Sequence, residues 1–562
     1  MDAEQTPKRS PSWWKDVVIY QIYPRSFNDS NGDGIGDLSG ITERVDHLAE
    51  LGVDVVWISP HFDSPNADNG YDIRDYYRVM AEFGTMADFD RMLAALNQRG
   101  IDLVLDLVVN HTSDEHQWFQ ESRSSRDNPY RDYYIWRDGS PDGGPPNNYM
   151  SFFGGSAWTH DPATDQWYLH YFDVKQPDLN WENPDVRSAV IELMRFWLDK
   201  GVAGFRMDVI PFISKQPGLP DLTPEQMWAP QNVYADGPRV HEFLQLLGRE
   251  VLKPYEAVSI GEAIGVTPEQ MPLFIDQARG ELSMMIMFDL VRLDILMWQK
   301  AEWELPQFKE VVARMDRGAG QGGWTTSYLG SHDGPRTVSH FGSEDPRWRD
   351  RSAKALATFI LTQRGTPIIY QGDEIGMTNY PFGSIEEFDD VAARGGWKQL
   401  VETGAVPADE YLANLRQTSR DNARTPMQWD GGPGAGFTTG DPWLAINPNH
   451  TEINVAAQLA DPDSVFHHHR RLIKLRHRMP VLVHGAFEDL DPHHEQVFAY
   501  TRSLDGDRVL VIINFGDEPV DYRLPDEIGL GDLLIDNIGV APSRLDSGNV
   551  RLDAWQAAVY TL

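Results

Sequence analysis

Short apolar runs recur along the chain and alternate with segments of helical periodicity. The runs occupy residues 17–24, 53–60, 101–109, 202–210, 257–263, 283–290, 325–333 and 366–374. Near-continuous apolar character is typical of strands that are buried on both faces, as in a parallel sheet. Between the runs, segments of helical periodicity end in glycine, a common helix stop, at 41–52, 89–100 and 186–201. Eight strands that alternate with helices predict an α/β fold, a (β/α)₈ TIM barrel.

Two connections are too long for simple loops and indicate further domains. Residues 110–181, rich in Asp, Gly, Pro and aromatic side chains, follow the third strand and predict a small inserted domain. A second excursion, 376–436, follows the eighth strand. Alternating strand-like runs over 481–562 predict a C-terminal antiparallel β domain of sandwich-like form. The catalytic barrel is therefore expected over 1–109 and 182–480.

The composition excludes several classes of protein. The 562 residues include no cysteine, so disulfides, thiol catalysis and cysteine metal sites are excluded. The formal net charge of −36 repels nucleic acid and anionic membranes, and suits either solubility or adaptation to high salt. The chain lacks an apolar run long enough to span a bilayer, and its first residues, MDAEQTPKRSPSWW, lack the apolar core of a secretory signal. We expect a cytoplasmic protein without nucleic-acid or membrane partners.

The stretch GFRMDVI (204–210) places Arg206 and Asp208 at alternate positions of an apolar strand, on the same face. Charged groups are rarely buried unless they are paired. Asp208 lies near the end of the fourth strand, Glu262 ends the fifth, and Asp333 ends the seventh. Because catalytic groups of such barrels lie at the carboxyl ends of the strands, we expect the three carboxylates to converge. A purely structural ion pair between Arg206 and Asp208 is the alternative.

Two carboxylates that flank a bond are the equipment of glycoside hydrolysis. One attacks the sugar or assists water, and the other protonates the leaving oxygen. The positive charge of Arg206 is expected to lower the pKa of Asp208, whereas burial and neighbouring carboxylates are expected to raise the pKa of Glu262.

Four segments occur in a fixed order: DLVVNH (106–111), GFRMDVI (204–210), GEAIG (261–265) and SHDGPR (331–336). Through them the chain resembles glycoside hydrolase family 13, the α-amylase family, over nearly its whole length. The likeness is to oligo-1,6-glucosidases and related α-glucosidases, through WWKDVVIYQIYPRSFNDSNGDGIGDLSGI, QPDLNWENP, NARTPMQW and GTPIIYQGDEIGM. The resemblance implies a small neutral oligosaccharide as substrate. Whether the protein is a monomer or a homo-oligomer stays open.

The resemblance also implies a role for each residue of the motifs. Asp208 is the nucleophile, and Glu262 is the general acid/base. Asp333 is a third carboxylate that binds sugar hydroxyls and helps to distort the ring, and Arg206 serves the nucleophile. The implied substrate-binding residues are His111 and His332, which donate hydrogen bonds to hydroxyls, Tyr71 under the sugar, and the pair Asp68 and Arg424, which closes the pocket around the non-reducing end.

A closed pocket makes the implied enzyme an exo-acting, retaining α-glucosidase that works through a covalent glucosyl–Asp208 intermediate. In the family, a valine after the nucleophile, here Val209, goes with α-1,6 activity and threonine with α-1,4 preference. The alternatives are an α-1,4- or sucrose-acting α-glucosidase, and a glucosyltransferase or sucrose isomerase on the same scaffold. Isomerases usually carry an FDT-type fourth-strand segment, and MDV differs from it. A non-catalytic homologue acting as a binding or transporter subunit is the alternative of a different class.

The segment DSNGDGIGD (29–37) resembles a cation-binding loop. Its candidate ligands stand at every second position: Asp29, Asn31, Asp33, Ile35 and Asp37. They copy the first nine positions of an EF-hand loop, in which Ile35 would offer its carbonyl oxygen. The twelfth position is Gly40, so the loop is no EF-hand, and a plain glycine-rich turn is the alternative. Oxygen ligands favour Ca²⁺, with Mg²⁺ as the other choice, and the resemblance implies a structural cation.

Overall fold

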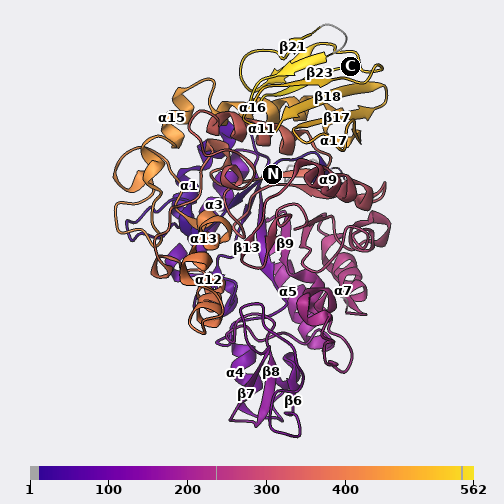
Figure 1. Cartoon of the computed structure of the whole chain (residues 1–562). Coiled ribbons are helices and arrows are strands. Elements are labelled where there is room, and N and C mark those ends of the chain that lie inside the picture. Colours follow the sequence, from indigo (N-terminus) through magenta and orange to yellow (C-terminus); the bar gives the residue numbers. More distant parts are fainter. Residues whose placement is uncertain (1–9, 11, 236, 546–548) are drawn as a thin grey trace, which may run out of the picture.

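The computed structural model describes residues 10, 12–235, 237–545 and 549–562. Most of the leading segment for which no secretory signal is expected lies outside the described residues. The described chain forms a barrel of parallel strands with a smaller domain at either end (Figure 1). Every helix in these ranges is too short or too polar to cross a lipid bilayer.

The barrel contains one strand from each of the eight apolar runs. In chain order these are β1 (Ile19–Ile22), β2 (Val55–Ile58), β5 (Asp102–Val108), β9 (Gly204–Asp208), β10 (Val258–Glu262), β11 (Met284–Ile286), β14 (Thr326–Ser327) and β15 (Thr366–Tyr370). Their order in the sheet is β11-β10-β9-β5-β2-β1-β15-β14, and a parallel bridge between Met285 and Thr325 joins the two end strands. The predicted fold class is confirmed.

Helices follow the strands and surround them. Those on the barrel include α2 (Val45–Leu51), α3 (Met86–Gln98), α5 (Pro184–Asp199), α7 (Val240–Leu247), α9 (Leu305–Ala319), α11 (Arg349–Thr362) and α16 (Val465–Arg478). The predicted glycine stops are present, since Gly52, Gly100 and Gly201 take positive φ angles of 95°, 73° and 104° directly after their helices.

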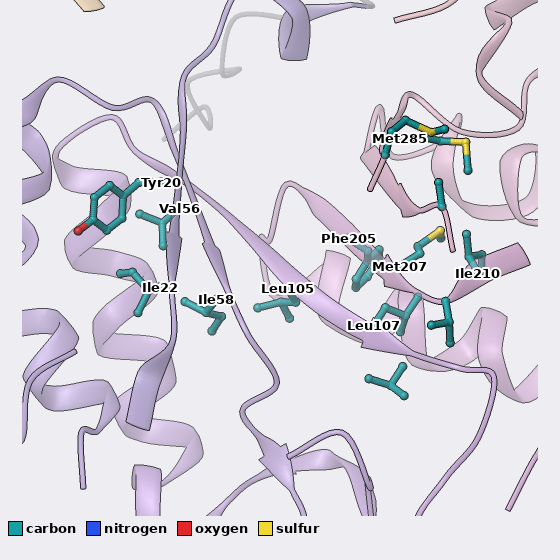
Figure 2. Packing of buried hydrophobic residues seen from close by; sticks show 14 of the residues in the cluster. Tyr20, Ile22, Val56, Ile58, Leu105, Leu107, Phe205, Met207, Ile210 and Met285 are labelled. Atoms are coloured by element: carbon teal, nitrogen blue, oxygen red, sulfur yellow. The ribbon is translucent and has the colours of Figure 1, made fainter. Parts of the chain in front are cut away.

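Alternation along the strands separates two apolar layers. Side chains on the outer face of the barrel pack toward the helices, as Figure 2 shows for Tyr20, Ile22, Val56, Ile58, Leu105, Leu107, Phe205 and Met207. The residues between them face the barrel axis and form a second cluster that includes Ile19, Val55, Trp57, Val104, Ile260 and Ile368. In β9, Phe205 and Met207 point outward, so Arg206 and Asp208 point into the barrel.

Two excursions leave the carboxyl ends of the strands. The segment after β5 holds α4 (Gln117–Ser124) and a sheet of β6 (Trp136–Arg137), β8 (Gln166–Leu169) and β7 (Trp158–Asp161), which projects from the barrel in Figure 1. The segment after β15 holds α12 (Val391–Gly396), the π-helix η11 (Trp397–Val401), α13 (Ala408–Thr418) and α14 (Asp421–Arg424). The domain boundaries drawn from the sequence stay predictions.

The C-terminal part is antiparallel, as predicted. Its larger sheet has the order β16 (Ala486–Asp489), β17 (Val497–Leu504), β18 (Asp507–Asn514), β23 (Ala557–Thr561), β20 (Leu533–Asp536). A smaller sheet joins β19 (Val520–Arg523), β22 (Asn549–Leu552) and β21 (Ser543–Arg544). Buried Arg502 of β17 donates hydrogen bonds to backbone carbonyl oxygens of α11 and of the segment before β16, which ties this domain to the barrel.

Candidate active site

Arg206 lies at the centre of a buried acidic cluster in the barrel. Its Nη1 is 2.8 Å from Asp106 Oδ1 and 2.8 Å from Asp208 Oδ1, and its Nη2 is 2.9 Å from Glu262 Oε1. Arg206 is 1% exposed and the three carboxylates are also buried. A buried charge is tolerated when it is paired, and loss of one partner from such a pair costs about 3–5 kcal/mol. The positive charge of Arg206 in β9 is thus compensated by Asp106 of β5 and Glu262 of β10 as well as by Asp208.

Asp208 and Glu262 lie within reach of each other. Asp208 contacts Nη1 of the Arg206 guanidinium at 2.8 Å, and Glu262 contacts Nη2 at 2.9 Å. The shared guanidinium keeps the two carboxyl groups near each other, and two carboxyl groups around one bond are what glycoside hydrolysis requires. The backbone N–H of Val209 also donates to Glu262 Oε2 at 2.9 Å.

The pKa of Asp208 shifts in the direction opposite to the one expected from Arg206. Burial and the negative charge of Glu262 raise the pKa of Asp208 well above its usual range, and Arg206 opposes them without prevailing. The expectation of a lowered pKa was wrong because it weighed one neighbour and left out burial and Glu262. Two carboxyl groups in such contact favour a state in which one is protonated and the other ionised.

Val209 holds an unusual backbone conformation beside Asp208 and Glu262. Its φ of 36° and ψ of 37° lie in the left-handed region, which disfavours a β-branched residue. Strain of this kind costs of order 1–3 kcal/mol and persists where the surroundings impose it. Here the conformation directs the N–H group of Val209 to Glu262. The residue that follows Asp208 therefore contacts Glu262 through its backbone.

Asp333 reaches the site from a loop. The strand β14 ends at Ser327, so the expectation that Asp333 ends the seventh strand was wrong. Asp333 Oδ1 lies 3.4 Å from Arg424 Nη2 and 3.6 Å from Arg420 Nη1, and Oδ2 lies 3.2 Å from His332 Nε2. Burial acts to raise the pKa of Asp333, but His332, Arg420 and Arg424 together outweigh it and hold the pKa well below its usual range.

Tyr71 and His332 form one wall of the site. Their rings stack with centroids 5.6 Å apart, and the Tyr71 hydroxyl contacts both His332 Nε2 and Asp106 Oδ2. The Gln21 amide lies 2.7 Å from His332 Nδ1. Burial lowers the pKa of His332 to about 3, so the imidazole is neutral at ordinary pH and can exchange hydrogen bonds with neutral hydroxyls.

His111 lies on the side of the site that faces the inserted domain. Its Nε2 is 3.2 Å from Gln176 Nε2, and that amide also donates to Asp68 Oδ2 at 3.2 Å. Burial lowers the pKa of His111 to about 4. Gln176 therefore links His111 to the carboxylate that was expected to close the pocket.

The pair that closes the pocket differs from the expected one. Asp68 Oδ1 lies 3.7 Å from Nη2 of Arg420, whereas Arg424 pairs with Asp333 and donates to the His332 carbonyl oxygen at 3.0 Å. The expectation of an Asp68–Arg424 pair was wrong because these two arginines, four positions apart, reach different carboxylates. Burial raises the pKa of Asp68 to about 7, although Arg420 and Arg424 oppose it.

Three further residues of the site were missed from the sequence. Asp106 binds Arg206, Gln176 links His111 to Asp68, and Arg420 joins Asp68 to Asp333. Each stands in or beside a segment that the sequence analysis used, namely DLVVNH, QPDLNWENP and NARTPMQW. The signal was present, but the side chains could be assigned only from their contacts.

The glycine-rich loop is held by its own hydrogen bonds. Asp29 accepts the N–H groups of Asn31, Gly32 and Gly34, and Asp37 accepts the N–H groups of Ser30 and Gly40. Each carboxylate oxygen has more than one lone pair, so these bonds are compatible with a cation. Within the described residues, however, there is no group of three or more His, Asp or Glu side chains arranged to hold a metal ion. The cation therefore stays a proposal.

Comparison with known proteins identifies the family. The model of the α-amylase catalytic domain matches residues 21–485, and that of the α-amylase SusG C-terminal domain matches residues 497–559. The chain belongs to the α-amylase family. The family resemblance read from the sequence motifs is confirmed.

Relatives of this α-amylase family member cover its whole length. An oligo-1,6-glucosidase from Parageobacillus thermoglucosidasius is 51% identical over 558 residues, 98% of this chain and 99% of that protein. The crystal structure of a trehalulose synthase from Pseudomonas mesoacidophila MX-45 is 53% identical with a TM-score of 0.96, and the match covers 98% and 99% of the two chains. An isomaltulose synthase mutant from Erwinia rhapontici NX5, solved with sucrose, is 51% identical with a TM-score of 0.96, over 99% and 100%. The protein is a glycoside hydrolase of this family.

Proposed function

We propose that the protein is a retaining, exo-acting α-glucosidase that releases glucose from the non-reducing ends of short α-glucosides and favours α-1,6 linkages. One observation carries the proposal: Asp208 and Glu262 share Arg206, and the Tyr71–His332 wall connects them to a second charged cluster of Asp68, Arg420 and Asp333 that we take as the end of the sugar site. A pocket that ends there admits one terminal sugar beyond the bond to be cleaved.

The far side of the pocket carries polar atoms suited to sugar hydroxyls. Within the described part of the chain, Asp68 Oδ1 and Arg424 Nη1 are buried and make no hydrogen bond. An unpaired buried polar group costs about 1–3 kcal/mol, and a hydroxyl can satisfy both an acceptor and a donor. Tyr71 and the neutral His332 add an aromatic wall of the kind that supports a sugar ring. This chemistry fits a neutral monosaccharide unit.

The proposed mechanism is double displacement. The two carboxyl groups share one proton, and the reaction uses the state in which Glu262 carries it. Ionised Asp208 then attacks the anomeric carbon while protonated Glu262 gives its proton to the glycosidic oxygen, so that a glucosyl–Asp208 ester forms and the aglycone leaves. Ionised Glu262 then takes a proton from water, whose oxygen attacks the same carbon and frees Asp208. Two inversions retain the α-configuration. Arg206 contacts both carboxylates, so it can follow the negative charge from one to the other.

The linkage preference rests on Val209 and on the names of relatives. Val209 is 3% exposed, follows Asp208 and donates its backbone N–H to Glu262, so a change of its side chain acts next to both carboxylates. One methyl-sized group changes selectivity by only about 1–3 kcal/mol. The relative from Parageobacillus thermoglucosidasius is named an oligo-1,6-glucosidase. We propose isomaltose and isomalto-oligosaccharides as preferred substrates and the cytoplasm as the site of action.

A second candidate is transfer or isomerisation on the same scaffold. The trehalulose and isomaltulose synthases are as similar to the chain as the oligo-1,6-glucosidase is, which makes sucrose the candidate glucosyl donor. Hydrolysis and isomerisation share the glucosyl intermediate and differ in the acceptor that reaches it. A non-catalytic binding subunit is the weaker alternative, because Asp208, Glu262 and Asp333 are all present and each is paired with an arginine, the first two with Arg206 and the third with Arg420 and Arg424.

Initial rates on isomaltose, maltose and sucrose, with product analysis, test the proposal. We expect isomaltose to be hydrolysed fastest, with α-glucose as the first product by NMR. Trehalulose or isomaltulose as the main product from sucrose would favour the isomerase. Absence of glucose release from all three sugars would contradict the proposed function.

A further inference from the structure

Arg420 faces three carboxylates but touches them unequally. Its guanidinium donates several hydrogen bonds to Asp390, from Nε to both carboxylate oxygens at 3.1 and 3.2 Å and from Nη2 to Oδ1. The distances to the two pocket carboxylates are longer, 3.7 Å to Asp68 Oδ1 and 3.6 Å to Asp333 Oδ1. N–H···O hydrogen bonds in proteins measure about 2.7–3.2 Å, so Arg420 is hydrogen-bonded to Asp390 and stands apart from the other two.

The longer distances leave room for a sugar hydroxyl. An oxygen at about 2.8 Å from each of two atoms can bridge them when they are less than twice that distance apart. The separation between Arg420 Nη2 and Asp68 Oδ1 meets this condition. A hydroxyl in that position would accept from Arg420 and donate to Asp68 Oδ1, which makes no hydrogen bond within the described part of the chain. The unpaired Asp68 oxygen beside Arg420 is therefore suited to a ligand hydroxyl.

Asp390 is itself fixed in position. It is 3% exposed and begins α12 as its N-cap, where its side chain accepts the N–H of Ala392 at 3.1 Å. Its own backbone N–H donates to Asp421 Oδ2 at 3.0 Å. The ring of Phe153, from the inserted domain, lies 5.6 Å from the Arg420 guanidinium. Arg420 is thus held between the excursion after β15 and the tip of the inserted domain.

We propose that Asp390 is a positioning residue for the terminal glucose, because it holds the Arg420 guanidinium away from Asp68 and Asp333 so that sugar hydroxyls fill the gap. The inference rests on the proposed function, and it assigns a role in substrate binding to a residue that lies behind the pocket. Without the charge of Asp390, the Arg420 guanidinium is attracted to Asp68 and Asp333. Arg424, which lies 3.4 Å from Asp333 Oδ1, is the cation that competes with Arg420 for Asp333. Direct ion pairs would then replace the bonds to the sugar.

The substitution Asp390→Asn tests this role, because asparagine has the same shape and is an equally good N-cap for α12. Glucose affinity is measured by calorimetry, kcat and KM on isomaltose by initial rates, and folding by thermal unfolding. We expect glucose to bind about 10- to 100-fold more weakly, from the loss of a charge-assisted hydrogen bond. KM should rise by a similar factor with kcat within threefold, because this contact lies far from the bond that breaks.

A matched control and a second variant complete the experiment. Asp316 of α9 also pairs with an arginine, with Arg364 at 3.3 Å, but lies outside the pocket, so Asp316→Asn should leave glucose affinity unchanged. Asp390→Ser, which also caps a helix, replaces Asp390→Asn if the latter fails to fold. A crystal structure of the folded variant should show Arg420 within about 3 Å of Asp68 or Asp333.

The outcomes separate the inference from the function on which it rests. Glucose affinity within twofold of the wild type in a folded Asp390 variant would overturn the positioning role. A variant with a lower melting temperature but unchanged glucose affinity would show a merely structural residue and would overturn it as well. Failure of the wild-type protein to release glucose from any α-glucoside would instead refute the proposed function.

Discussion

His61 is a buried histidine that should make the protein sensitive to acid. Its ring stacks on Phe89 at 5.2 Å and contacts Phe62 and Trp197 at 4.5 and 5.3 Å between centroids. Neither ring nitrogen has a hydrogen-bond partner in the described part of the chain, and the residue is 0% exposed. Burial alone lowers the pKa of His61 from 6.5 to about 3. The neutral ring is therefore strongly preferred in the folded protein.

The substitution His61→Phe removes this titration and keeps an aromatic ring in place. The pKa of His61 is lower in the folded protein than in the unfolded chain. The folded protein therefore keeps its full stability above pH 6.5 and loses stability as the pH falls toward 3. At pH 8 the contribution of protonation is close to zero. A pH of 5 is about 1.5 units below the pKa of the histidine in the unfolded chain. At about 1.36 kcal/mol per pH unit, protonation of the unfolded chain lowers the free energy of unfolding of the wild type by about 2 kcal/mol. Phenylalanine loses none.

Urea unfolding of both proteins at pH 8 and pH 5 measures the effect. Any packing penalty of the larger ring is the same at both pH values, so it cancels in the difference. We expect the free energy of unfolding of His61→Phe minus that of the wild type to be about 2 kcal/mol larger at pH 5 than at pH 8. His493→Phe, at an exposed position, serves as the control and should show no such difference. An equal relative stability of His61→Phe at both pH values would refute the reasoning.

Four further predictions concern the site and the loop. Asp208→Asn and Glu262→Gln should each abolish glucose release from isomaltose while circular dichroism stays unchanged, and near-normal turnover in either would contradict the roles given. Asp106→Asn should lower kcat/KM by about 10- to 100-fold without abolishing it, because one charge-assisted bond to the buried guanidinium is lost; unchanged kinetics would show that the bond is dispensable. Val209→Thr should shift the ratio of rates toward maltose, and an unchanged ratio would remove the linkage argument. If a cation occupies residues 29–37, a chelator should lower the melting temperature more than the activity at low temperature, and an unmoved melting temperature would remove that proposal.

Local pattern was sufficient to predict the barrel. The eight apolar runs each contain a barrel strand, because burial on both faces demands apolar residues over a short continuous stretch. Alternation along the strand likewise placed Arg206 and Asp208 on one face. The carboxyl ends of parallel strands meet at one end of a barrel, so Asp208 and Glu262 could be expected together before any contact was known.

Which charged groups meet inside the pocket was decided by the tertiary structure. The sequence motif indicated Arg424 as the partner of Asp68, and the orientation of the chain around α14 gives it Arg420 instead. Asp333 reaches the site from a loop, so the length of its strand was no guide.

The sequence by itself determined the barrel, the order of its strands along the chain and the convergence of acidic groups at one end. The tertiary structure alone decided the partners of each charge and the direction in which the pKa of Asp208 moves. The physical reason is range: strand patterns follow from neighbours a few residues apart, whereas burial and Coulomb interactions sum over groups that the sequence places far from one another.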